Sequence, residues 1–81
     1  MTLKELQEIV VDNDNDFYFT FDGKRAGVES TTVNYQTTYA LWWGDLEKEY
    51  DSFMAVVCDP VFNDESIVTL LSKNKIEIEF S

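Results

Sequence analysis

The chain contains no histidine, one cysteine, one proline, three glycines and only six basic residues. Without histidine, the commonest general base is missing, and so is the usual activator of a serine or cysteine nucleophile. The single cysteine, Cys58, allows no intrachain disulfide and fits a small buried apolar side chain in a reduced, cytoplasmic setting. Six basic residues are too few to form the clusters that phosphate contacts need. These absences predict a non-enzymatic protein that does not itself bind nucleic acid or an anionic membrane, and that carries no cofactor.

Long hydrophobic runs are also missing. The longest uninterrupted apolar stretch covers residues 53–58, which is far too short to span a bilayer, and the N-terminus has no signal-peptide pattern. What is present is a chain of 81 residues of which 44% are hydrophobic and 15% aromatic. That composition is typical of a globular protein, and this length predicts a single acidic domain over residues 1–81.

Acidic residues outnumber basic ones by 16 to 6, which gives a net charge of −10. The excess is concentrated in residues 1–22 and 45–66, whereas residues 23–44 and 67–81 are close to neutral. Helix N-termini and solubility explain part of this excess. So large a net charge on a small domain destabilises it by self-repulsion, so we expect the two acidic blocks to serve an interaction.

The N-terminal half predicts a helix followed by strands. Thr2 and Glu5 match a capping box, and apolar residues then recur at helical spacing until about Val11. The alternation in 17–21 predicts a strand, and Asp22-Gly23 predicts a hairpin turn. A change of apolar phase predicts a bulge or turn around residues 30–34, and a further strand is expected over 37–43.

The C-terminal half predicts two helices and a final strand. Apolar spacing from Tyr50 to Val61 favours a helix ended by Pro60, although residues 53–58 are also compatible with a strand. A short helix capped by Asn63 or Asp64 is expected next, with a left-handed stop at Asn74. Residues 75–80 alternate as a strand. The order α-β-β-β-α-α-β predicts an α+β fold, with a three- to four-stranded, mostly antiparallel sheet covered by helices on one face.

The run of aspartates Asp12, Asp14 and Asp16 matches positions 1, 3 and 5 of a calcium-binding loop. The match fails at position 6, which is Phe17, and at position 12, which is Gly23. A helix-to-strand connection explains the same residues, and no phosphate-binding loop or zinc spacing is present, so we predict no metal site.

Two features favour a binding surface. Consecutive strand residues point to opposite faces, so Trp42 and Trp43 cannot both enter one core layer. Either both faces of the sheet are covered, or one tryptophan is partly exposed as a binding anchor, or it is packed under a loop at the edge. Carboxylates at i and i+2 of an extended segment stand about 6.6 Å apart. Glu77 and Glu79 have this spacing, as the three aspartates would if extended, and such a row is similar to successive phosphates of one nucleic-acid strand.

Three segments, 38–45 (TYALWWGD), 50–53 (YDSF) and 62–66 (FNDES), resemble a pattern seen in small proteins encoded by phages and prophages of Gram-positive bacteria. The resemblance covers roughly the C-terminal half and brings no catalytic residues. It implies an accessory gene of a mobile element, among which anti-CRISPR and other anti-defence inhibitors recur, several of them DNA mimics.

The sequence thus predicts a cytoplasmic, acidic inhibitor that binds a basic nucleic-acid-binding protein of the host cell. The alternatives are a phage structural or assembly module that forms a homodimer or larger homo-oligomer through a sheet edge or its tryptophan-bearing face, and an immunity protein against a basic toxin. The candidate partner-binding residues are Asp12, Asp14, Asp16, Trp42, Trp43, Asp45, Glu47, Glu49, Asp51, Asp64 and Glu65.

Overall fold

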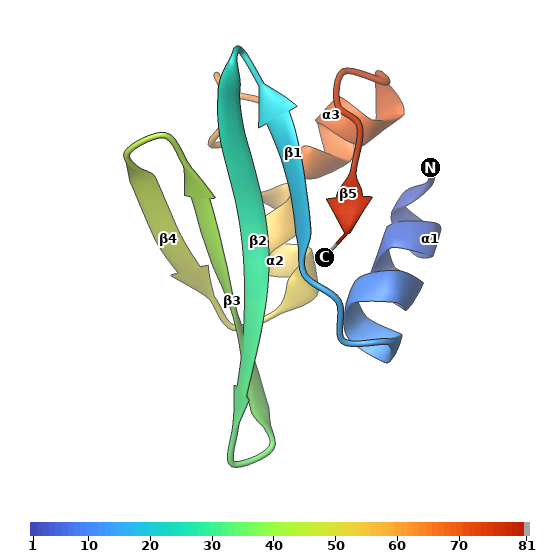
Figure 1. Ribbon diagram of the computed structural model, residues 1–81, viewed down its shortest axis with the longest axis vertical. Coiled ribbons are helices and arrows are strands. Elements are labelled where there is room, and N and C mark those ends of the chain that lie inside the picture. Colours follow the sequence, from blue (N-terminus) through green and yellow to red (C-terminus); the bar gives the residue numbers. More distant parts are fainter. Residues whose placement is uncertain (81) are drawn as a thin grey trace.

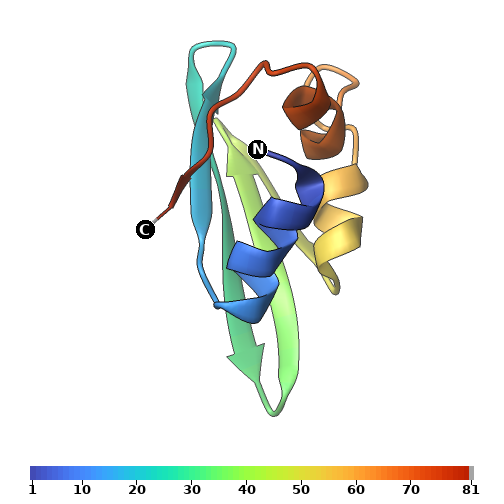
Figure 2. The same ribbon diagram turned by 90° about the vertical axis from the view of Figure 1, so that its right-hand side faces the viewer.

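The computed structural model describes residues 1–80 and contains one five-stranded antiparallel sheet with the spatial order β4-β3-β2-β1-β5 (Figure 1). The helices lie on one side of this sheet and leave its other side open (Figure 2). The predicted α+β class is confirmed, but the sheet has five strands where three to four were predicted. The elements are α1 (Leu3–Gln7), the π-helical turn η1 (Glu8–Asp12), β1 (Phe17–Phe21), β2 (Lys24–Val33), β3 (Gln36–Trp43), β4 (Leu46–Tyr50), α2 (Phe53–Cys58), α3 (Ile67–Ser72) and β5 (Glu79–Phe80).

The first helix begins as its capping box predicts. The Thr2 hydroxyl accepts from the Glu5 amide at 3.1 Å, and the Glu5 carboxylate accepts from the Thr2 amide at 2.9 Å. Each bond satisfies an amide that the first helical turn leaves without a partner. The helix continues into η1, which ends at Asp12, one residue beyond the predicted stop.

Three two-residue turns connect β1 to β4. Asp22-Gly23 forms the predicted hairpin, with both residues at positive φ. The bulge or turn predicted around 30–34 lies later in the chain: residues 30–33 continue β2 in regular register, and a second such turn follows at Asn34-Tyr35, with φ of 50° and 64°. The third turn is Gly44-Asp45. A left-handed tyrosine is unusual where glycine or asparagine is preferred, and Tyr35 is fully exposed at the tip of the β2–β3 arm, which is drawn at the bottom of Figure 1.

The hydrophobic core lies between the helices and one face of the sheet, which we call the inner face. The largest fully buried side chains from the sheet are Phe17, Phe19 and Leu41, all with exposed fractions of 1% or less. The helical layer contributes Leu6 and Phe62 at 0% and further apolar residues of α2 and α3. A single cluster therefore joins the N-terminal helix, the sheet and the C-terminal helices.

The C-terminal half differs from the prediction in its details. Residues 53–58 form helix α2, as the apolar spacing favoured, but Cys58 is exposed and not buried as expected, because it lies at the solvent side of the last turn. Helix α3 is capped by Ser66 and not by Asn63 or Asp64.

The predicted final strand over 75–80 is shorter than expected. Only Glu79 and Phe80 pair with β1, opposite Tyr18 and Phe17. The predicted stop at Asn74 is confirmed, since this residue has the left-handed φ of 54° that ends helix α3.

Candidate protein-binding face

The side of the sheet turned away from the helices is its outer face. Successive strand residues alternate between the two faces, so the registers of the four strand pairs determine which residues share it. Figure 2 shows no helix on this side. The outer face includes Tyr18, Arg25, Gly27, Glu29, Ala40, Trp42, Glu47, Glu49 and Glu79.

An aromatic pair occupies the middle of the outer face. Tyr18, Gly27 and Trp42 lie side by side on β1, β2 and β3, and the two rings approach each other across the glycine with centroids 6.2 Å apart. A Cβ at Gly27 would stand 2.6 Å from Trp42 Cζ2 and 2.7 Å from Tyr18 Cδ1. The absence of a side chain on β2 is therefore what lets both rings lie down on the sheet.

Carboxylates flank this pair at both ends of the same row. The row continues from Trp42 to Glu47 on β4, and from Tyr18 to Glu79 on β5. The Arg25 guanidinium holds Glu79 at 2.7 Å. Glu47 takes part in none of the four salt bridges formed within residues 1–80.

The next row of the outer face contains Glu29, Ala40 and Glu49 on β2, β3 and β4. Both glutamates are exposed and stand outside the four salt bridges of the described chain. The Tyr18 hydroxyl donates to Glu29 at 3.3 Å. Beside Trp42 these side chains border a shallow hollow of about 460 Å³. A flat aromatic ring next to several carboxylates is an arrangement suited to a guanidinium or ammonium group.

The two tryptophans have separate roles, as the alternation of strand residues requires. Trp43 faces the helices, where its ring packs on Phe62 and Phe21 at centroid distances of 5.1 and 5.6 Å. Its indole N–H donates to the Phe21 carbonyl at 3.0 Å, and the Lys24 ammonium lies 5.1 Å from the ring centroid. Trp43 is therefore part of the core boundary, and Trp42 belongs to the outer face.

The N-terminal aspartates lie in the connection between η1 and β1. Asp12 ends η1, and Asp14 has a left-handed φ of 53°, so the three residues do not form the extended row that mimicry of a nucleic-acid strand would need. Asp16 accepts from the Ser30 amide at 3.0 Å, and the Ser30 hydroxyl lies 3.4 Å from both Asp14 and Asp16. Asp14 and Asp16 precede β1, so these carboxylates continue the hydrogen bonding with β2 past the first residue of β1, Phe17.

The second acidic block is dispersed as well. Asp45 lies in the β3–β4 turn, Asp51 follows β4, and Asp64 lies between α2 and α3 with a left-handed φ of 67°. Only Glu47 and Glu49 of the predicted acidic residues share the outer face with Trp42. The fold does not bring the two acidic blocks onto one face.

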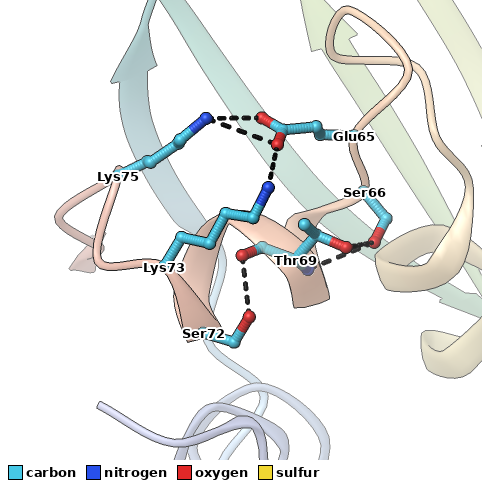
Figure 3. A network of polar contacts seen from close by, with 6 residues as sticks. All are labelled: Glu65, Ser66, Thr69, Ser72, Lys73 and Lys75. Atoms are coloured by element: carbon cyan, nitrogen blue, oxygen red, sulfur yellow. Dashed lines mark hydrogen bonds and ion pairs between the residues drawn. The ribbon is translucent and has the colours of Figure 1, made fainter.

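Glu65 is held by two lysines (Figure 3). Lys73 approaches it at 2.7 Å and Lys75 at 3.1 Å, so its charge is compensated within the chain. The hydrogen bonds from Lys73 and then Lys75 keep the pKa of the Glu65 carboxyl below its usual value. This pair of contacts ties the connection before α3 to the segment after it.

Replacing Glu65 by glutamine is expected to lower the melting temperature near neutral pH. The pKa of Glu65 is depressed in the folded state, so this carboxylate contributes to the stability of the fold at pH values above its pKa in the unfolded chain, about 4.3. That contribution is lost as the pH falls through the lower folded value. Thermal melts of wild type and Glu65→Gln should therefore differ at about pH 7 and converge at about pH 2. Glu77→Gln serves as the control, because Glu77 is in none of the four salt bridges and its loss should not lower stability. A gap of equal size at both pH values would contradict the assignment.

Comparison with protein-family models, with curated proteins and with solved structures gave no match to the chain. No helix within residues 1–80 is both long and apolar enough to cross a bilayer, and no three potential metal ligands come together in that range. Sequence reasoning had not selected Tyr18, Gly27 or Glu29. Tyr18 alternates with the phenylalanines of 17–21, which indicates the opposite face, and a glycine inside a strand indicates close approach of a neighbour.

Proposed function

We propose that this chain is a non-enzymatic binding protein that inhibits a basic, nucleic-acid-binding protein by covering part of its positively charged surface. The observation that supports the proposal is the outer face, where Glu29, Glu47 and Glu49 surround Trp42 without a salt-bridge partner in the described chain. Carboxylates with an aromatic anchor suit the arginine and lysine side chains that normally contact phosphates.

The proposed binding surface is smaller than the one predicted from the sequence. Glu47 and Glu49, two residues apart on β4, retain a spacing similar to that of successive phosphates, and Glu29 adds a third charge across the sheet. Asp14, Asp16 and Glu65, which have contacts within the chain, are left out of the binding surface. Asp12 is left out as well, because it ends η1 away from the outer face of the sheet. We also propose that the protein acts in the cytoplasm of a bacterial host and inhibits a defence system there. This part of the proposal is based on the resemblance to phage-encoded proteins.

A homo-oligomer through the same face is the weaker candidate. A second copy placed against the outer face would bring its own carboxylates next to those of the first. Like charges in contact oppose such an assembly at low salt.

The test compares two variants with equal loss of charge. Glu29→Gln/Glu47→Gln/Glu49→Gln removes three charges from the outer face, and Asp12→Asn/Asp45→Asn/Asp64→Asn removes three elsewhere. Each protein is immobilised, incubated with a nuclease-treated bacterial lysate, and washed. Captured proteins are then released with duplex DNA and tested for DNA binding.

We expect wild type and the aspartate variant to retain DNA-binding proteins that DNA and raised salt release, and the glutamate variant to retain far less. Equal retention by both variants would show that only the net charge matters and would overturn the proposal. Capture that neither DNA nor salt reverses would do the same.

A further inference from the structure

Strand β4 forms one edge of the sheet, and no other segment lies beyond it in Figure 1. An edge strand has a row of unpaired backbone groups, to which another extended chain can add. Natural edges are protected by charges, bulges or covering segments. The residues of β4 therefore determine which kind of chain this edge accepts.

The register identifies the backbone groups that are free. In antiparallel strands, hydrogen-bonded pairs alternate with pairs that are not hydrogen-bonded, and a two-residue turn closes on a hydrogen-bonded pair, here Trp43 and Leu46. Two residues further on, Leu41–Lys48 is again hydrogen-bonded. The N–H and C=O groups of Glu47 and Glu49 consequently point away from β3, toward the open edge.

The same two residues carry the charge of the edge. Their side chains lie on the outer face, so each free backbone donor and acceptor stands beside a carboxylate that has no salt bridge in the described chain. On the inner side, Lys48 is already paired with Asp59 at 2.6 Å, and Asp59 also accepts from the Tyr50 hydroxyl at 2.6 Å. The inner side of β4 therefore has no uncompensated charge.

A second copy of this chain is a poor occupant. Antiparallel pairing centred on Lys48 would put Glu47 of one copy opposite Glu49 of the other, on both sides of the centre, and Lys48 opposite its own copy. Directly opposed like charges destabilise a strand pair. The pattern thus protects the edge against self-association and leaves it complementary to a basic strand.

We propose that β4 accepts an extended segment of a partner protein as a sixth strand, and that this segment carries arginine or lysine at positions i and i+2 with an uncharged residue between them. The two basic residues would lie opposite Glu47 and Glu49 on the outer face and exchange backbone hydrogen bonds with them. The inference rests on the proposed function and deepens it, because it names the chemistry and the backbone conformation of the bound segment.

The probe is the acetylated and amidated peptide Thr-Arg-Val-Arg-Thr. One control carries the same sequence with both arginine amides N-methylated, which keeps the charge and removes the backbone donors. A second control, Thr-Arg-Arg-Val-Thr, has the same composition without the i, i+2 spacing. Binding is followed by NMR, with hydrogen exchange measured at the amides of Glu47 and Glu49.

At saturation by the first peptide, we expect exchange at both amides to slow by about tenfold or more, because they become hydrogen-bonded. Both controls should bind more weakly and leave that exchange unchanged. Glu47→Gln/Glu49→Gln should lose most of the affinity, whereas Asp12→Asn/Asp64→Asn, with the same loss of charge, should keep it.

Equal affinity for the N-methylated peptide, or unchanged exchange at both amides, would overturn strand addition. The proposed function would still stand if basic proteins were captured through the side chains of the outer face alone. The capture experiment and the exchange experiment therefore fail independently.

Discussion

Replacing Phe62 by alanine is expected to lower the free energy of unfolding by about 3–5 kcal/mol. The side chain is 0% exposed, and its ring contacts those of Phe19, Phe21 and Trp43 at centroid distances of 5.3, 5.9 and 5.1 Å. Its backbone is fixed by two hydrogen bonds with Glu65, each of 3.0 Å, so the surrounding chain cannot close over the cavity. A domain of this length has a total stability of about 4–12 kcal/mol, so this one change removes a large part of it.

Chemical denaturation followed by circular dichroism measures this loss. Phe62→Leu keeps most of the volume and should cost markedly less, and Met54→Ala, at an exposed position of α2, should change stability by no more than about 0.5 kcal/mol. If Phe62→Ala cost no more than Met54→Ala, the ring could not be the link between sheet and helices.

Gly27→Ala is the second change with a large expected effect, of about 1–3 kcal/mol. The added Cβ meets the rings of Trp42 and Tyr18 at 2.6–2.7 Å, so both must swing off the sheet. The lower chain entropy of the unfolded alanine variant offsets part of this cost. The near-ultraviolet circular dichroism of the aromatic residues should change even where the protein stays folded.

A mutant cycle identifies the cause. In the background Tyr18→Ala/Trp42→Ala no ring stands over Gly27, so the same glycine substitution should cost much less there than in wild type. An equal cost in both backgrounds would show that the backbone of β2, and not the aromatic pair, requires glycine.

Local signals in the sequence correctly predicted the start of the first helix, the first hairpin turn and the residue that stops α3. The capping box at Thr2, the hairpin at Asp22-Gly23 and the stop at Asn74 each depend on interactions within a few residues, so one segment contains the whole cause. The alternation that assigned 37–43 to a strand has the same local origin. It also predicted that Trp42 and Trp43 point to opposite faces, although which of them faces solvent required the position of the helices.

Strand β4 was missed because three of its five residues are charged. Its alternation is present, with Leu46, Lys48 and Tyr50 on the inner side, but a half-exposed edge strand has little apolar periodicity to detect. The C-terminal strand was overestimated for the opposite reason. Residues 75–80 alternate well, yet pairing is a property of the neighbour, and β1 pairs with only two of them.

The candidate binding face could be predicted only in part. Glu47, Glu49 and Trp42 were selected from charge and aromatic content. Glu29 comes from another strand, and its place in the same patch depends on the register of β2 with β3. Asp14 and Asp16 were selected on the same grounds, but they bond to Ser30 in the folded chain, a contact across 14 or more residues that spacing alone does not indicate.

Cys58 is the only cysteine of the sequence, so a thiol-reactive reagent would attach to one site on one side of the molecule. The thiol is exposed at the end of α2, in the helical layer, while the outer face of the sheet points the opposite way (Figure 2). A maleimide-linked surface or dye attached there would leave the face around Trp42 open to an incoming partner. Molecules tethered in this manner would all be oriented alike, so a biosensor chip could measure binding to one side of the protein only.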